Sequence, residues 1–407
     1  MSLINNFTLK DTAQLDAFGR LKVSAPSALF DNMFEYGLNT MHWESSVVGG
    51  SVTHVDNNCA ERLSTGGTTD ANNAIIQTRK YMRYQPGRSL NVETTFAMSA
   101  EQTNSIARIG YFDASNGIFL ERSGSTINIV RRTNVTGTPV DNVVSKSSWN
   151  VDKFDGNGVS GKTLDLTKTN ILFIQLQFLG VGRVQVGFVI DGVPYVAHQF
   201  LNAGVLSTVY MSSGCLPVRG EVRNTGTAGG TLTMDMFCTS VSSGGLGQEL
   251  INRSISNGIT AITTGTTLVP IISIRAATLL GGTSGGGSIT NRGHIEPTDI
   301  NLLVSSGTHE YRVLRNATLT GASWTAVGAE SIADYDVSST AISGGTLIDC
   351  GYIAASASAR GSIGVDFNVN PVVYTGLNSS QDILTIAART TSGAGTALGA
   401  FSWNEQY

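Results

Sequence analysis

Apolar and polar residues alternate one by one in many short stretches of this chain, and this period of two constrains the fold more than any other feature. In residues 92–98, Val92, Phe96 and Met98 share one side, and Glu93 and Thr95 lie on the other. The same alternation recurs in residues 184–190, 232–238, 363–369, 384–386 and 401–403. Successive side chains of a strand point to opposite faces, so each stretch predicts an antiparallel strand with one buried face. No amphipathic helical pattern extends beyond two turns.

Turn residues stand between the expected strands. Asn116-Gly117 and Asp191-Gly192 each separate two apolar runs, and both dipeptides predict type I′ hairpins. The run from residue 171 to residue 200 then becomes three strands in sequence, which predicts a meander within one sheet of a sandwich or jelly roll.

The composition agrees with a turn-rich β protein of two domains. The chain has 407 residues, too many for one ordinary sandwich, with 14% charged residues and 47 glycines. A Gly-Ser stretch at residues 242–247 predicts a boundary between domains. We therefore expect an all-β chain with an N-terminal attachment arm (1–28) and two antiparallel, jelly-roll-like β-sandwich domains (29–245 and 246–407).

The arm has too little apolar surface to form a core of its own. Its candidate assembly residues are Phe18, Arg20, Leu21 and Val23, and we expect them to become ordered by docking on another surface. The loop of residues 281–287 is rich in glycine, and we expect it to be mobile or to be ordered only in an assembly.

Charge and hydropathy exclude several partners. The net charge of −4 and the pI near 5.8 argue against nucleic acid as a main partner. No apolar run is long enough to span a bilayer, and residues 1–10 lack the apolar region of a signal peptide. We therefore expect no membrane partner and folding in a cytoplasm.

The four cysteines are far apart in sequence, which excludes a local metal knuckle. We expect free, buried thiols, and Cys238 belongs to the set expected to be buried in residues 232–238. A bridge between Cys215 and Cys238 stays open if their strands are neighbours.

Residues 156–163 match the phosphate-binding pattern GxxxxGK[ST] letter for letter. That chemistry needs a buried strand before the loop and a helix after it, and this sequence predicts neither. We expect a surface loop and no nucleotide. Asp152, Asp155 and Asn157 in the same region do not fit the calcium-binding pattern, so no cofactor or metal is expected.

No other motif indicates catalysis. The five histidines form no metal-binding pair and no GxSxG turn is present, although a triad assembled in space stays open. The basic segment of residues 79–88 would suit either anion contact or a strand with outward cations, and we expect the strand. Tyr111, Tyr195 and Tyr210 could stack on sugars, but we expect them to pack against the sheets.

Several segments resemble a family of tailed-bacteriophage virion proteins, variously described as structural, capsid-associated or tail-fibre proteins. They include residues 16–21, 83–87, 108–113, 149–153, 188–192, 291–293 and 402–405. The resemblance spans nearly the whole chain and implies a virion location, without implying a place on the particle or any catalytic residue.

From these observations we expect a non-enzymatic virion structural protein that assembles with itself, as a trimer, and with other virion proteins. The alternative is a receptor-binding tail fibre that recognises host surface glycans. An enzyme, either a depolymerase or an esterase, is the second rival; depolymerase tailspikes usually carry β-helix repeats, and this sequence has none.

Overall fold

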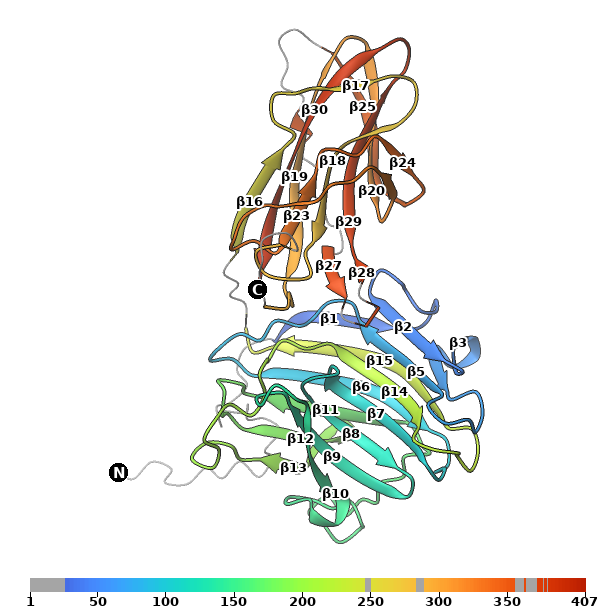
Figure 1. Cartoon of the computed structure of the whole chain (residues 1–407). Helices are drawn as coiled ribbons and strands as arrows, with labels where there is room; N and C mark the ends of the chain where they lie inside the picture. The colour runs from blue at the N-terminus through green and yellow to red at the C-terminus, as the bar shows by residue number, and fades with distance from the viewer. Residues whose placement is uncertain are drawn as a thin grey trace, which may run out of the picture. The chain divides into compact units, whose positions relative to one another are not determined.

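The computed structural model describes residues 26–245, 250–282, 289–355, 362–363, 372–375, 377–378 and 380–407. Its regular structure is antiparallel β-sheet, and the described helices are two short 3-10 turns, η2 (Asp56–Asn58) and η3 (Lys146–Ser148) (Figure 1). The all-β prediction is confirmed. The chain divides into two compact units, Met1–Gly247 and Gln248–Tyr407, while the predicted boundary lay between residues 245 and 246.

The first unit contains two sheets whose neighbouring strands come from distant parts of the sequence. The first sheet has the order β13-β12-β11-β6-β15-β4-β3, and β1 also pairs with β15. Its strands are β1 (Ser27–Met33), β3 (Ser51–Val55), β4 (Ala60–Ser64), β6 (Leu90–Met98), β11 (Asn170–Leu176), β12 (Val184–Ile190), β13 (Val193–Phe200) and β15 (Thr233–Ser243). The predicted meander of residues 171–200 is confirmed as β11, β12 and β13.

The second sheet of this unit has the order β10-β9-β8-β7-β14-β5-β2 (Figure 1). Its strands are β2 (Trp43–Val48), β5 (Asn73–Thr78), β7 (Ser105–Phe112), β8 (Gly117–Ser123), β9 (Thr126–Thr133), β10 (Val140–Ser145) and β14 (Val218–Asn224). In both sheets a late strand, β15 or β14, lies between early ones, which gives the jelly-roll character.

The core of the first unit joins the inward faces of its two sheets. Glu93, Thr95 and Ala97 of β6 are half-buried, while Val92, Phe96 and Met98 are buried, as the alternation predicted. They belong to one apolar cluster with Trp43 of β2 and Tyr111 of β7. Burial of such a side chain contributes about 1.5 to 3 kcal/mol, so the inward face fixes the register of each strand.

Two hairpin predictions have different outcomes. Asp191 and Gly192 form a two-residue loop with φ of 54° and 79°, which confirms the type I′ turn. Asn116-Gly117 is not the centre of such a turn, because Gly117 already pairs with Phe112. The connection is a four-residue loop instead, in which the Asp113 carboxylate accepts hydrogen bonds from the amides of Ser115 and Asn116.

Two other predictions are corrected. The register of β15 shifts between Met236 and Thr239, and this bulge turns Cys238 outward, so Cys238 is exposed. Residues 79–88 form the connection between β5 and β6 rather than a strand, and only Met82 makes an isolated bridge, to Leu216. Within this connection Tyr84 is buried and packs edge-to-face on Phe178.

The second unit is also built from antiparallel sheets. One sheet has the order β16-β30-β19-β27-β28, with β17 on β30 and β26 on β19, and the other has the order β22-β23-β18-β29-β20-β25. The first set comprises β16 (Ile251–Ser256), β17 (Ile262–Thr264), β19 (His294–Ser305), β26 (Ser362–Ile363), β27 (Val372–Thr375), β28 (Ser380–Gln381) and β30 (Gly395–Gln406). The second comprises β18 (Val269–Ala276), β20 (Thr308–Arg315), β22 (Thr325–Ala326), β23 (Ala333–Asp336), β25 (Thr346–Ala354) and β29 (Ile383–Thr390). Strands β21 (Thr318–Thr320) and β24 (Ala341–Ser343) form a separate pair.

Phe401 and Trp403 of β30 are buried in the core of this unit, and Ser402 between them is not, as predicted. Most of two other expected features, the alternation of residues 363–369 and the glycine-rich loop of residues 281–287, lies outside the described residues. Ser27 and Ala28, which were assigned to the arm, belong to β1 and pair with β15.

Candidate functional site

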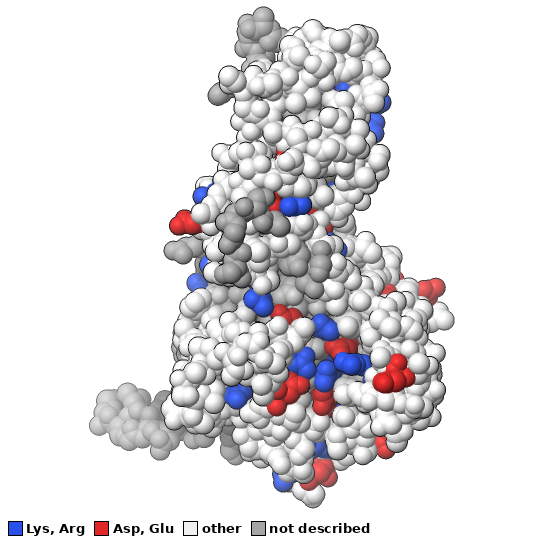
Figure 2. Space-filling view, in the orientation of Figure 1, with Lys and Arg blue, Asp and Glu red and all other residues white. Residues whose placement is uncertain are grey.

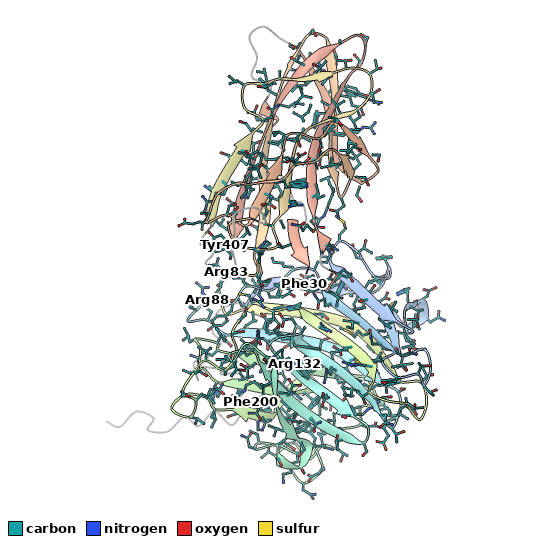
Figure 3. The ribbon with its side chains drawn as sticks, in the orientation of Figure 1. Phe30, Arg83, Arg88, Arg132, Phe200 and Tyr407 are labelled. Atoms are coloured by element: carbon teal, nitrogen blue, oxygen red, sulfur yellow. The ribbon has the colours of Figure 1, made fainter. Side chains whose placement is uncertain are left out.

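The outer face of the second sheet of the first unit carries an unusual concentration of charged side chains. Figure 2 shows blue and red atoms intermixed on this unit, over the place where Figure 3 labels Arg132. The strand order explains the gathering, because β8, β7 and β14 are neighbours although β14 is distant in sequence. Arg108 of β7 thereby lies directly opposite both Glu121 of β8 and Glu221 of β14.

Ion pairs cross these strands. Arg108 Nε lies 2.8 Å from Glu121 Oε2, and its Nη1 lies 3.6 Å from Glu221 Oε1. Arg219 Nη2 lies 2.9 Å from Glu221 Oε2. Each of these side chains is mostly buried, so the face is a polar network rather than a set of solvated charges.

A further pair completes the network at the edge of the sheet. Arg132 of β9 holds Asp141 of β10 through two parallel hydrogen bonds, of 2.8 and 2.9 Å. Burial alone would lower the pKa of Arg132, but the hydrogen bond and charge of Asp141, with the charges of Glu221 and Glu121, outweigh it and raise this pKa. The pKa of Arg132 is therefore raised by carboxylates on three other strands.

An apolar floor supports the guanidinium groups. Phe112, Phe119 and Val130 form a small buried cluster on this side of the sheet. The guanidinium carbons of Arg108 and Arg132 lie 5.5 and 5.1 Å from the centre of the Phe119 ring, within range of cation–π attraction. Residue 110 has no room for a side chain, because a Cβ there would lie 2.7 Å from the Cα of Phe119. The glycine at residue 110 therefore allows Phe119 to pack closely beneath the guanidinium groups.

A cavity of about 400 Å³ opens in this network, and we call it the arginine pocket. Its lining comprises Arg108, Ala114, Arg132, Pro139, Asp141, Arg219, Glu221 and Arg223. Four arginines against two carboxylates give the lining a formal excess of positive charge. Arg223 follows Arg219 and Glu221 at intervals of two along β14, and unlike them it is exposed.

The guanidinium groups of the pocket are suited to contact with an anion. A guanidinium group presents a rigid fork of donors that matches a carboxylate or phosphate group. A glycosidase, by contrast, needs one carboxyl group as an acid and a second as a base or nucleophile. Here Glu121, Glu221 and Asp141 are each engaged by a guanidinium group.

The structure locates the other residues singled out in the sequence. Phe18, Arg20, Leu21 and Val23 lie outside the described residues. Tyr111 and Tyr210 are fully buried and Tyr195 packs against the core, so the expected packing role is confirmed for all three.

The region that matches the phosphate-binding pattern is a loop, as predicted. No helix follows it; Thr163 makes an isolated bridge with Asp155, and β11 begins at Asn170. The loop is held by the buried Asp152 carboxylate, which accepts hydrogen bonds from the amides of Phe154 and Ser160, both 2.7 Å long. Lys162 lies 3.3 Å from Asp191 on the surface. This lysine is part of an exposed ion pair.

The four cysteines are free, so the bridge between Cys215 and Cys238 does not form. Burial was wrongly predicted for Cys59, Cys238 and Cys350, which are exposed. Within the described ranges, no group of three or more His, Cys, Asp or Glu side chains is placed to hold a metal ion. No helix among the described residues is long and apolar enough to cross a membrane.

The sequence analysis missed the arginine pocket. Its signal was present as polar residues at intervals of two, such as Arg219, Glu221 and Arg223, on strands with an apolar opposite face. The assembly of those residues into one site depends on strand order, which local patterns do not contain.

No protein-family model matches the chain, and no curated protein does either. Among solved structures, the Bacillus licheniformis β-glucanase matches with a TM-score of 0.35 and 11% identity, over 54% of this chain and 98% of its own. The carbohydrate recognition domain of Emp47p matches with a TM-score of 0.34 and 11% identity, over 55% and 99%. A glycoside hydrolase family protein from Mycobacterium thermorestibile matches with a TM-score of 0.37 and 12% identity, over 52% and 99%. Likenesses this distant carry no inference about function.

Proposed function

We propose that this chain is a non-enzymatic structural protein of a tailed-phage virion, which assembles with itself and with other virion proteins. The virion part of the proposal rests on the resemblance in sequence described above. The assembly part rests on one observation, the low number of charged residues in the second unit, where seven arginines and eleven Asp or Glu residues are found among about 160 residues.

The second unit has seven arginines and no lysine. Several of its charges are also withdrawn from the surface, since Arg315, Asp334, Asp382 and Glu405 are all buried. On the face in view, Figure 2 shows this unit mostly white among the described atoms, with a few separate blue and red groups. A monomer normally stays soluble through a mixed, charged surface, so a surface of this kind favours burial against other subunits.

Strand β25 is the part of the second unit that we expect to contact another subunit. It pairs with β20 along one edge, and no described strand pairs with its other edge. Natural edge strands are usually protected by lysine, proline, short length or bulges. β25 has nine residues with neither lysine nor proline, and its one charged residue, Asp349, accepts a hydrogen bond from the Tyr311 hydroxyl. Its bulge lies at the Leu347 end, which leaves residues 349–354 regular. Tyr352 on this strand is 72% exposed.

The proposed occupant of this edge is a second copy of the chain, and a trimer is the assembly we expect first. The non-enzymatic part of the proposal is supported by the arginine pocket, where the carboxylates of Glu121, Glu221 and Asp141 are held by guanidinium groups.

The test is a charge placed on the edge strand. Tyr352→Lys should weaken self-association by about 10- to 100-fold, because it removes about 1.5 to 3 kcal/mol of apolar burial at each contact. Sedimentation velocity over a range of concentrations measures the change. The matched control is Ile259→Lys, which places the same charge at a 98% exposed turn of the same unit. Equal effects of the two variants, or no association in the parent protein, would contradict the proposal that β25 mediates self-association.

A further inference from the structure

The arginine pocket lies on the first unit, whereas the proposed self-assembly uses strand β25 of the second unit. Most charges of the pocket are internally paired, but the pairing is incomplete. Arg223 stands at the exposed end of the row that β14 presents, and no ion pair involving it is found among the described residues. It is the cation of the pocket that is most available to a ligand.

A second observation concerns Arg219. This side chain is 8% exposed, and its Nε is buried without a hydrogen-bond partner in the described part of the chain. Its other nitrogens are used, since Nη2 donates to Glu221 and Nη1 contacts Gln77. Buried donors are nearly always satisfied in native proteins, by protein, water or ligand. The described protein groups therefore leave one donor of the pocket's network unpaired.

The mixture of charges in the pocket restricts the kind of ligand that the pocket can bind. The exposed guanidinium group of Arg223 favours an anion with planar oxygens, such as a carboxylate, and the other arginines of the pocket add positive charge beside it. Asp141 and Glu221 are acceptors only, and suit a ligand that also has hydroxyl donors. They oppose a dense run of phosphates, as does the net charge of −4, so a nucleic acid is disfavoured. A cavity of about 400 Å³ is in the usual range for a small molecule.

We propose that the arginine pocket binds a carboxylate-bearing saccharide, with Arg223 as a direct ligand of the carboxylate and with Asp141 and Glu221 accepting hydrogen bonds from sugar hydroxyls. The same chemistry serves a free acidic sugar and an acidic residue of a polysaccharide. The pocket gives the first unit a binding role in addition to assembly.

The test compares two sugars that differ in one group. D-Glucuronate and D-glucose differ at carbon 6, which is a carboxylate in the first and a hydroxymethyl group in the second. Titration of the full-length protein with each, followed by ligand-observed NMR and calorimetry, should give saturable binding of glucuronate that is at least about 10-fold tighter than that of glucose. A short oligomer of glucuronate distinguishes the two sources, because tighter binding of the oligomer indicates a polysaccharide.

Variants distinguish a specific contact between Arg223 and glucuronate from a general effect of the protein's charge. Arg223→Ala should weaken glucuronate binding by about 10-fold, since it removes a charge-assisted hydrogen bond, and Arg223→Lys should recover part of the loss. The matched control is Lys168→Ala, which removes one exposed positive charge from the loop before β11, on the other sheet, and should change binding less than about twofold. The thermal midpoint of each variant establishes that it is folded.

Four results would overturn the proposal. Glucose and glucuronate could bind equally, or neither could bind at tens of millimolar. Arg223→Ala and Lys168→Ala could have the same effect. Inorganic phosphate could displace glucuronate at equal concentration, which would indicate an anion site without selectivity for a saccharide.

Discussion

The buried ion pair of the second unit gives a prediction whose size follows from the structure. Arg315, at the end of β20, is 1% exposed, and Asp382, next to β29, is fully buried. Arg315 Nη2 lies 2.5 Å from Asp382 Oδ2, and Asn316 Nδ2 donates to the other carboxylate oxygen at 3.0 Å. Asp382→Ala leaves the guanidinium group buried without this partner, which costs about 3 to 5 kcal/mol. For a unit of about 160 residues, this lowers the melting temperature by roughly 10 °C.

Differential scanning calorimetry of the full-length protein measures the loss. The melting transition of the second unit should move and that of the first should not, because the pair lies within one unit. Replacing both partners, Arg315→Met with Asp382→Leu, should recover most of the stability, since no unpaired charge remains. The matched control is Lys162→Ala, which breaks an exposed pair and should cost at most about 1 kcal/mol. An equally small cost for Asp382→Ala would refute the reasoning.

Three further predictions concern pH, nucleotide and the arm. Burial would raise the pKa of Asp336, but hydrogen bonds from Ser338 and Ser339 outweigh it and hold this pKa below its ordinary value. Its contribution to stability is present above its unfolded pKa and is lost as the pH falls through the folded pKa, so Asp336→Asn should flatten the acid limb of unfolding curves measured below about pH 4. Lys162→Ala should leave binding of labelled ATP unchanged and negligible, and saturable binding abolished by this change would overturn the surface-loop interpretation. Deletion of residues 1–27 should weaken oligomerisation or attachment in light scattering while calorimetry still detects both units, and an unchanged mass and attachment would show that the arm has no such role.

Local sequence patterns were sufficient for much of the fold. The alternation in β6 identified its buried face, and Asp191-Gly192 identified a tight hairpin, because both features depend on a few adjacent residues. The bulge of β15 was not predictable in this way. It arises where β15 changes its pairing with β6 between Met236 and Thr239, and it reverses the direction of Cys238.

The arginine pocket could not be predicted from local sequence patterns. Glu121 opposes Arg108 in the hairpin of β7 and β8, but Glu221 becomes a neighbour of Arg108 only because β14 inserts between β7 and β5. That insertion joins segments about a hundred residues apart, and the period of two within each strand contains no information about it. Residue spacing identified each strand separately, while the site depends on which strands pair.

The proposal that this chain is a virion protein can be tested by immunoelectron microscopy. An antibody raised against the first unit would be used for gold labelling of purified particles of the phage proposed to encode this chain. Our account predicts label at a regular position on intact particles, at several copies per site as a homo-oligomer requires. Particles without label, with the protein found only in the soluble fraction of infected cells, would contradict it.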